Sequence, residues 1–280
     1  MKKVLITGKN SYVGTRLMTW LGNFPDRYSI DSISLRDDSW KDKDFSGYDV
    51  VVHVAGIAHI KETKENAELY YRVNRDLAYE VAQKAKIECV KQFIFLSSMS
   101  VYGKECGVID KSTPLKPKSN YGKSKLQAEE LITTLEDPYF KVAILRPPMI
   151  YGKGCKGNYP RLANLAVKIP VFPLIENKRS MIFIDNLCEF IRLIIDDYCA
   201  GVFFPQNEDY VCTSEMVKIV AELHGTNIRL TKMFNPLLRI LRVRTINKVF
   251  GDLIYDKQLD EFKNRYTIYD FKTSISLTEN

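Results

Sequence analysis

Short apolar segments alternate with longer amphipathic ones through the first two-thirds of this 280-residue chain. The segments at 49–54 and 92–97 are apolar almost throughout, which is typical of strands buried on both faces of a sheet. Strands that alternate with helices favour right-handed crossovers and a parallel sheet. The sequence therefore predicts a doubly wound α/β fold, whose ligand lies over the carboxyl ends of the strands. We expect strands at Lys2–Thr7, Tyr28–Leu35, Asp49–Val54, Gln92–Ser97 and Lys141–Arg146, and helices at Ser11–Gly22, Glu65–Lys86 and Asn120–Glu136.

The pattern loosens after Pro147, where prolines and glycines cluster as far as Pro173. Two later segments, 181–196 and 201–204, look sheet-associated, and the chain from Thr213 onward looks helical and basic. We therefore expect a dinucleotide-binding domain at 1–150 plus about 181–212. A smaller, mostly helical substrate lobe is expected at about 151–180 plus 213–280.

The composition is typical of a soluble globular protein, with 27% charged and 45% hydrophobic residues. No apolar run reaches the ~18 residues that a membrane-spanning helix needs. The N-terminus has too few apolar residues for a signal peptide and is interpreted as a first strand. Six scattered cysteines without a C-x-x-C pair favour free thiols in a reducing, cytoplasmic setting. The three histidines have no spacing that predicts a metal site.

A glycine turn joins the first expected strand to the first expected helix, over Thr7–Gly14. Such a turn brings the backbone close to a pyrophosphate and presents the amides of a helix N-terminus to it. Ser11 stands where the usual pattern has its middle glycine, and a Cβ there can crowd the phosphate and resists positive φ. The turn indicates dinucleotide binding, with an ordinary strand–helix turn as the alternative.

The end of the second expected strand bears on the choice of cofactor. In NAD-binding versions of this fold an acidic residue there binds the ribose hydroxyls. Here Arg36 stands at about that place, and its planar fork can pair with a 2′-phosphate, with help from Lys9. NADP(H) is therefore favoured and NAD(H) stays possible. If the alignment slips by one residue, Asp37 is the ribose ligand and Arg36 is a solvated charge.

A tyrosine and a lysine four residues apart begin the helix at Asn120–Glu136. Tyr121 and Lys125 share one helix face, and a nearby ammonium lowers the pKa of a phenol, which is otherwise ~10. That spacing alone is also common on solvated helices. A buried strand that ends in serines at 97–100 precedes it, at the sheet edge where ligands bind. The glycine turn, the serines and the Tyr/Lys helix together indicate a redox site with Tyr121 as acid–base catalyst.

In these motifs the chain is similar to the extended short-chain dehydrogenase/reductases, Rossmann-fold enzymes, in their nucleotide-sugar epimerase/dehydratase branch. The likeness covers nearly the whole chain. It includes the glycine turn, "VVHVAG" (51–56), "VNRD" (73–76), "SSMSVYG" (97–103), "YGKSK" (121–125), "LRPPMIYG" (145–152), "GNYPRL" (157–162) and "RSMIFIDNL" (179–187).

The resemblance implies a role for each matching position. The catalytic residues are Ser98, Tyr121 and Lys125. Binding of the cofactor falls to Gly8, Lys9, Ser11, Tyr12, Val13, Gly14, Arg36, Val54, Ala55, Gly56, Asn74, Tyr121, Lys125 and Pro148. Binding of the nucleotide-linked substrate falls to Ser98, Ser100, Asn158, Arg161 and Arg179, of which Asn158 and Arg179 resemble the family's contacts to the diphosphate.

Three chemistries of this branch compete. The 4,6-dehydratases carry an Asp-Glu pair directly after the catalytic hydroxyl, whereas Met99 and Ser100 stand there, so dehydration is disfavoured. Arg36 favours an NADPH-dependent 4-ketoreductase that acts on a nucleotide-linked, UDP-type keto-sugar. A UDP-sugar 4-epimerase with tightly bound NAD is the alternative. A non-catalytic dinucleotide-sensing protein is a further alternative, although such proteins often lose the tyrosine or the lysine that this chain keeps.

The stretch 226–250 has six basic residues and no acidic one, within a net charge of +7. We expect an amphipathic helix at Asn235–Phe250. Its basic face is solvated, contacts the diphosphate of the substrate, or makes peripheral contact with a membrane or partner. Binding to nucleic acid is not expected. The resemblance also implies a homodimer through the helices at 65–86 and 120–136. The basic residues are Arg229, Lys232, Arg239, Arg242, Arg244 and Lys248.

Overall fold

The computed structural model describes residues 1–58, 60, 62–63, 65–233, 235, 249–262 and 265–280. Contacts between Cα atoms divide the chain into two compact units. Unit 1 comprises 1–103, 114–147 and 187–205, and unit 2 comprises 104–113, 148–186 and 206–280. These units are defined by contacts alone, and the domain bounds expected from the sequence stay a prediction.

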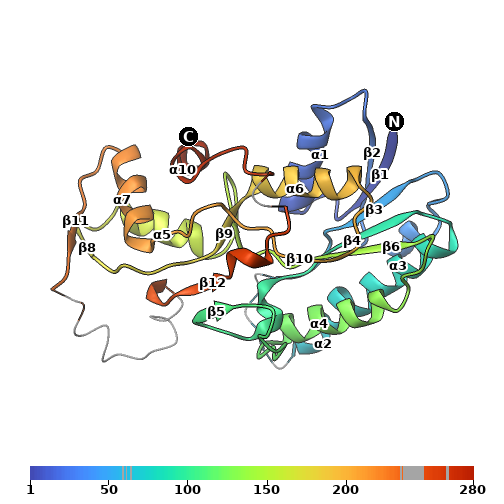
Figure 1. Cartoon of the computed structure of the whole chain (residues 1–280), viewed down its shortest axis with the longest axis horizontal. Coiled ribbons are helices and arrows are strands. Elements are labelled where there is room, and N and C mark those ends of the chain that lie inside the picture. Colours follow the sequence, from blue (N-terminus) through green and yellow to red (C-terminus); the bar gives the residue numbers. More distant parts are fainter. Residues whose placement is uncertain (59, 61, 64, 234, 236–248, 263–264) are drawn as a thin grey trace. The chain divides into compact units, whose positions relative to one another are not determined.

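Unit 1 is built on a parallel sheet of six strands in the order β10-β6-β4-β3-β1-β2 (Figure 1). The chain places β2 on one side of β1 and β3 on the other, so the strand order reverses between β1 and β3. This reversal is the switch point at which doubly wound sheets bind ligands. The expected doubly wound α/β fold is confirmed. The strands are β1 (Lys2–Thr7), β2 (Tyr28–Ile33), β3 (Val50–His53), β4 (Gln92–Leu96), β6 (Lys141–Leu145) and β10 (Gly201–Phe203).

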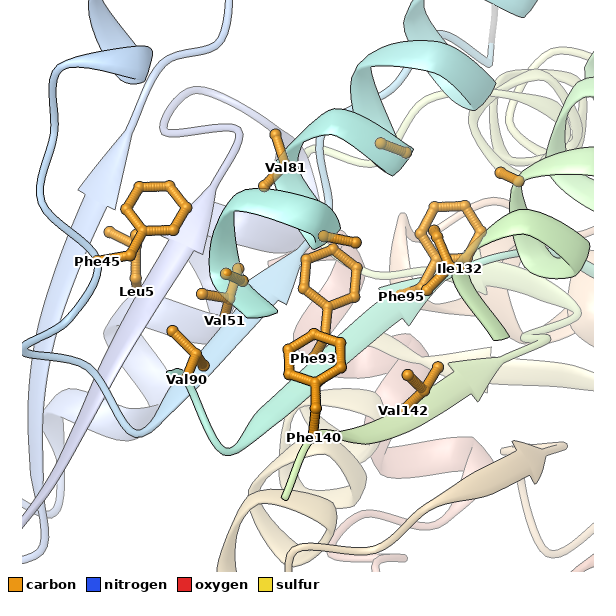
Figure 2. Packing of buried hydrophobic residues seen from close by; sticks show 14 of the residues in the cluster. Leu5, Phe45, Val51, Val81, Val90, Phe93, Phe95, Ile132, Phe140 and Val142 are labelled. Carbon is orange, nitrogen blue, oxygen red and sulfur yellow. The ribbon is translucent and has the colours of Figure 1, made fainter. Parts of the chain in front are cut away.

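Helices cover both faces of this sheet (Figure 1). On one face α3 and α4 pack on β3, β4 and β6, and Figure 2 shows Phe93 and Phe95 in the same buried cluster as Val81 and Ile132. On the other face lie α1 and α6, joined by a bond of 3.0 Å from Trp20 Nε1 to Glu189 Oε2. Burial of these apolar side chains is the main force that holds the layers together. The elements are α1 (Tyr12–Gly22), η1 (Asp38–Lys41), α2 (Ala67–Tyr71), η2 (Arg72–Asp76), α3 (Leu77–Ile87), η3 (Met99–Tyr102), α4 (Asn120–Thr133) and α6 (Ile184–Asp196), whose first three residues belong to unit 2.

The long helix expected at 65–86 is interrupted. It consists of α2, a π-helical turn η2 and α3. The inserted turn carries Asn74. Its side-chain oxygen accepts a hydrogen bond from the backbone amide of Ile57, and its side-chain nitrogen donates one to the carbonyl oxygen of Ile57. Because hydrophobic periodicity does not reveal a single widened turn, the sequence predicted one regular helix.

Among its described residues unit 2 contains three pairs of short parallel strands, together with the helices α5, α7 and α10 and the 3-10 helix η4. The pairs are β7 with β9, β8 with β11, and β5 with β12. The chain from Thr213 onward was expected to be helical. This expectation is only partly right, since β11 and β12 are strands. The elements are β5 (Gly107–Ile109), β7 (Met149–Tyr151), α5 (Asn158–Ala166), β8 (Val171–Pro173), β9 (Met181–Phe183), α7 (Thr213–Leu223), β11 (Arg229–Thr231), β12 (Leu253–Tyr255), η4 (Lys257–Leu259) and α10 (Phe271–Glu279).

Two further expectations concern the later segments. The segment expected at 181–196 divides into strand β9 and helix α6, and 201–203 is an edge strand of the large sheet, as expected. The basic helix expected at Asn235–Phe250 falls on 236–248, outside the described residues, together with Arg239, Arg242, Arg244 and Lys248. Arg229 begins β11 and Lys232 follows that strand. No helix in the described ranges is long and apolar enough to span a bilayer.

Candidate active site

The glycine turn after β1 is closely packed against the loop after β3. Gly8 has φ +88°, and a Cβ added there would lie 3.0 Å from Ala55 Cα. A Cβ on Gly14 would lie 2.8 Å from the carbonyl oxygen of Gly8 and 3.1 Å from Val54 Cγ2. Both positions therefore need glycine, the first for its backbone and the second for the close approach of helix to strand.

Ser11 fits this turn better than the sequence indicated. Its backbone is extended, at φ −77° and ψ 149°, so no positive φ is required. Its Oγ accepts a hydrogen bond of 3.0 Å from the amide of Gly14 and caps α1. The amide of Val13 lies in the first helical turn, where no intrahelical acceptor exists. The turn thus offers a helix N-terminus of the kind that binds a pyrophosphate, and it fits a dinucleotide.

The carboxyl end of β2 lies beside the glycine turn, because the amides of Gly8 and Lys9 both bond the carbonyl oxygen of Ile33, at 3.0 and 3.1 Å. Beyond it, Asp37 caps η1 by accepting from the amide of Ser39 at 3.1 Å and from its hydroxyl. Arg36 is exposed. The carboxylate that could have bound a ribose is therefore engaged in a cap, and the guanidinium next to it faces solvent.

Ser98 and Tyr121 meet at the end of β4. Ser98 caps η3, where its Oγ accepts from the amide of Ser100 at 3.1 Å and lies 3.1 Å from Ser100 Oγ. Burial raises the pKa of the Tyr121 phenol, and the nearby hydroxyl of Ser98 acts against that rise. The expectation of a lowered Tyr121 pKa is wrong for this arrangement, and the phenol is protonated at neutral pH.

Lys125 lies beneath Tyr121 on the same face of α4, with only 4% of its surface exposed. Its Nζ donates a hydrogen bond of 2.7 Å to the carbonyl oxygen of Leu96 and lies 4.5 Å from the centre of the Phe95 ring. Burial lowers the pKa of Lys125 to about 7, although the carboxylate of Glu129 raises it. The amine is thus poised between its two protonation states near neutral pH.

Two close contacts fix α4 relative to its neighbours. A Cβ on Gly122 would lie 2.7 Å from the carbonyl oxygen of Ser100, so this glycine lets the helix pack directly on η3. On the other side, Asn74 donates to Ser124 Oγ at 3.2 Å and exchanges two bonds with the backbone of Ile57. A Cβ on Gly56 would lie 2.9 Å from Asn74 Oδ1. Asn74 therefore ties the loop after β3 to the helix of Tyr121 and Lys125.

Three of the expected substrate residues, Asn158, Arg161 and Arg179, lie in unit 2, whereas Ser98 and Ser100 lie in unit 1. Pro148, which was expected to contact the cofactor, is buried at the start of the segment 148–186 of unit 2. Asn158, at the first turn of α5, and Arg179 line one hollow. Arg179 Nη1 bonds the carbonyl oxygen of Gly251 at 2.9 Å, and burial lowers the pKa of this guanidinium, against the field of Asp252. Arg161 is exposed and is not among the residues that line the hollow, which are Met149, Asn158, Leu162, Arg179, Met181, Val211, Thr213, Met216 and Val249.

Sequence reasoning missed a group of buried polar residues behind the Tyr121–Lys125 face: Ser97, Glu129 and Arg146. Glu129 is four residues after Lys125, so the spacing that joined Tyr121 to Lys125 also pointed to it. Within the described residues there is no cluster of three His, Cys, Asp or Glu side chains that could hold a metal ion.

The chain is similar to known proteins over most of its length. The family model described as the NAD dependent epimerase/dehydratase family matches residues 4–212. The chain belongs to this family. It is 32% identical over 249 residues to the UDP-glucose 4-epimerase of Vibrio cholerae, an alignment covering 79% of this chain and 75% of that protein.

Solved structures with 18% identity share the fold. A UDP-glucuronic acid 4-epimerase from Bacillus cereus in complex with NAD has a TM-score of 0.75 and covers 99% of this chain and 97% of that one. A dTDP-4-dehydrorhamnose reductase from Bacillus anthracis in complex with NADP has a TM-score of 0.70, with 99% and 98% covered. The family resemblance, the Rossmann-like fold and the expectation of an NAD(P)-dependent nucleotide-sugar enzyme are confirmed.

Proposed function

We propose that this protein is an NADPH-dependent 4-ketoreductase that acts on a UDP-linked keto-sugar. The observation that carries the proposal is the carboxyl end of β2, where Asp37 is engaged as a helix cap and Arg36 is exposed. A guanidinium there pairs with the 2′-phosphate that distinguishes NADPH from NADH, and Lys9 in the adjoining turn adds a second positive charge.

The residues around Ser98 suit proton delivery to a keto oxygen. When bound, NADPH supplies the hydride that adds to C4. The phenol of Tyr121 is protonated at neutral pH and donates the proton that the C4 oxygen requires, while the hydroxyl of Ser98 holds that oxygen. Lys125 stabilises the phenolate left behind and holds the ribose of the cofactor. One hydride and one proton thus convert the ketone to an alcohol.

The nucleotide part of the substrate would be held by unit 2. Asn158 and Arg179 line one hollow, and a buried guanidinium with a lowered pKa gains most from an anionic ligand such as a diphosphate. The relative in Vibrio cholerae is named for UDP-glucose, which supports UDP as the carrier. Arg161, exposed on α5, would contribute only at the edge of this site.

Dehydration is a poorer fit. Met99 and Ser100, the first residues of η3, occupy the places where the dehydratases that resemble this chain carry an acidic pair. With neither a carboxylate acid nor a base there, elimination of water across C5–C6 has no proton carrier.

A 4-epimerase with tightly bound NAD is the second candidate, favoured by the 32% identity to the Vibrio cholerae enzyme. An epimerase oxidises C4 and then reduces the opposite face, so it needs the same Ser98, Tyr121 and Lys125. The two candidates differ in whether the cofactor is consumed.

A cofactor test on purified protein separates them. The reductase predicts no nucleotide released on denaturation, stronger thermal protection by NADPH than by NADH, and oxidation of NADPH with a UDP-4-keto-6-deoxysugar. Released NAD together with interconversion of UDP-glucose and UDP-galactose, without net change in cofactor, would establish the epimerase instead.

A homodimer through the helices at 65–86 and 120–136, cytoplasmic location and peripheral membrane contact of the basic stretch stay predictions. Mass photometry and sedimentation with anionic vesicles test the first and the last.

A further inference from the structure

A buried ion pair lies directly behind the catalytic face of α4. Glu129 is 4% exposed and Arg146 is 8% exposed. Arg146 Nη2 lies 2.6 Å from Glu129 Oε2, and its Nε lies 3.1 Å from each carboxylate oxygen. Such a pair contributes little net stability, because the desolvation of both charges offsets their attraction. Its place in the fold therefore calls for another explanation.

The pair is linked to both ends of the segment that carries Ser98. The hydroxyl of Ser97, the residue before Ser98, donates to Glu129 Oε1. At the other end, Arg146 Nη1 donates a bond of 3.0 Å to the hydroxyl of Tyr102, the last residue of η3. Four elements thus meet at one buried point: the end of β4, η3, α4 and the residue after β6.

The Glu129–Arg146 pair is also connected to Lys125 in two ways. Glu129 is four residues after Lys125 on α4, so the two side chains share a helix face. Lys125 Nζ also bonds the carbonyl oxygen of Leu96, the residue before Ser97. The end of β4 is therefore held once by the lysine and once by the carboxylate.

We propose that Glu129 and Arg146 are positioning residues: they brace Ser98 against the helix of Tyr121, and the carboxylate of Glu129 is a counter-charge that favours the ammonium form of Lys125. The assignment of a catalytic purpose rests on the proposed function. The brace rests on the hydrogen bonds of Glu129 and Arg146. The counter-charge rests on the place of Glu129 one helical turn after Lys125 and on its effect on the pKa of that amine.

The charged surroundings of Lys125 support the second part. Burial lowers the pKa of Lys125 to about 7, and Glu129 is the group that raises it. From β3, His53 faces the same amine, but burial lowers the pKa of His53 to about 3, so the imidazole is neutral. Tyr121, one turn earlier on α4, is protonated. Among these described groups Glu129 is the negative charge that favours protonated Lys125, and the same carboxylate also pairs with the guanidinium of Arg146.

The test measures the titration of Lys125 without substrate or cofactor. Acetylation of its amine by acetic anhydride at a series of pH values, read by mass spectrometry of the peptide, gives the midpoint. We expect Glu129→Gln to lower that midpoint by about one pH unit or more, the usual effect of a neighbouring opposite charge. Ser97→Ala is the matched control: it breaks a link to Glu129 but keeps the charge, so its midpoint should equal that of the wild type.

An unchanged midpoint in folded Glu129→Gln overturns the counter-charge. Should that variant not fold, the double variant Ser97→Ala/Tyr102→Phe tests the brace, since it cuts both links and keeps the ion pair. We expect its kcat to fall about tenfold, with the pH profile of kcat/KM unmoved. A wild-type kcat in that variant overturns the brace. Absence of any turnover in the wild type refutes the proposed function, while the acetylation midpoints still decide the inference.

Discussion

The substitution Gly122→Ala puts the packing of α4 on η3 to the test. Helix propensity favours alanine by about 1 kcal/mol. However, the new Cβ would lie 2.7 Å from the carbonyl oxygen of Ser100 and 3.0 Å from Pro117 Cβ. Real Cβ atoms do not approach an oxygen that closely, so helix or turn must shift, at a cost of about 1–3 kcal/mol. The net expectation is a loss of up to about 2 kcal/mol in the free energy of unfolding.

The same shift moves Ser98 away from Tyr121, because Ser98 caps the turn that carries Ser100. A displacement of a few tenths of an ångström at reacting groups should lower kcat about tenfold. Urea unfolding measures the first effect and steady-state turnover the second. Gly22→Ala is the control, because Gly22 also lies in a helix but a Cβ there meets nothing within 4 Å. If Gly122→Ala is as stable and active as Gly22→Ala, the close packing of α4 on η3 is refuted.

Three further predictions follow from the site. Tyr121→Phe should lower kcat at least about 100-fold while leaving the Kd for NADPH, measured by fluorescence, nearly unchanged; full turnover would remove Tyr121 from the mechanism. Arg36→Gln should weaken NADPH binding about tenfold or more relative to NADH, and an unchanged ratio of the two Kd values would remove the case for NADPH. The pKa of His53 is about 3 in the folded protein and about 6.5 in the unfolded chain. As the pH falls from about 6 to 3, the wild type should therefore lose about 1.4 kcal/mol of stability per pH unit relative to His53→Gln. Parallel curves of stability against pH for the two proteins would contradict this.

The main features of the fold were predictable because their signals are periodic. Buried parallel strands are apolar runs, and the ends of β3 and β4 lie within one residue of the predicted bounds. The π-helical turn at Arg72–Asp76 was not predictable, although its Asn74 forms two hydrogen bonds with the backbone of Ile57, in the loop after β3. Such tertiary hydrogen bonds leave no mark on hydrophobic spacing.

The candidate site, like the fold, was predictable from the sequence only in part. Ser98 and Tyr121 could be placed together because one ends a strand and the other begins a helix at the same sheet edge. The direction of the Tyr121 pKa shift could not be predicted, since it depends on burial by surrounding side chains. Ser11 was expected to strain the turn, yet its φ is negative and its hydroxyl caps the helix. Sequence alone does not give the backbone conformation of a single turn residue.

The π-helical turn between α2 and α3 has a consequence for the whole segment 67–87. One extra residue per turn rotates everything after it by about 100° relative to a regular helix. Before the turn, Tyr70 is directed to the ring of Tyr121, with centroids 6.5 Å apart; after it, Val81, Ala82 and Ala85 enter the core beneath the sheet. The side chains before the turn are thus oriented toward the catalytic centre, and those after it toward the core. Loss of a single residue at 72–76 would rotate one part relative to the other, so that both orientations could not be kept. The length of this turn is therefore as important to the site as any side chain.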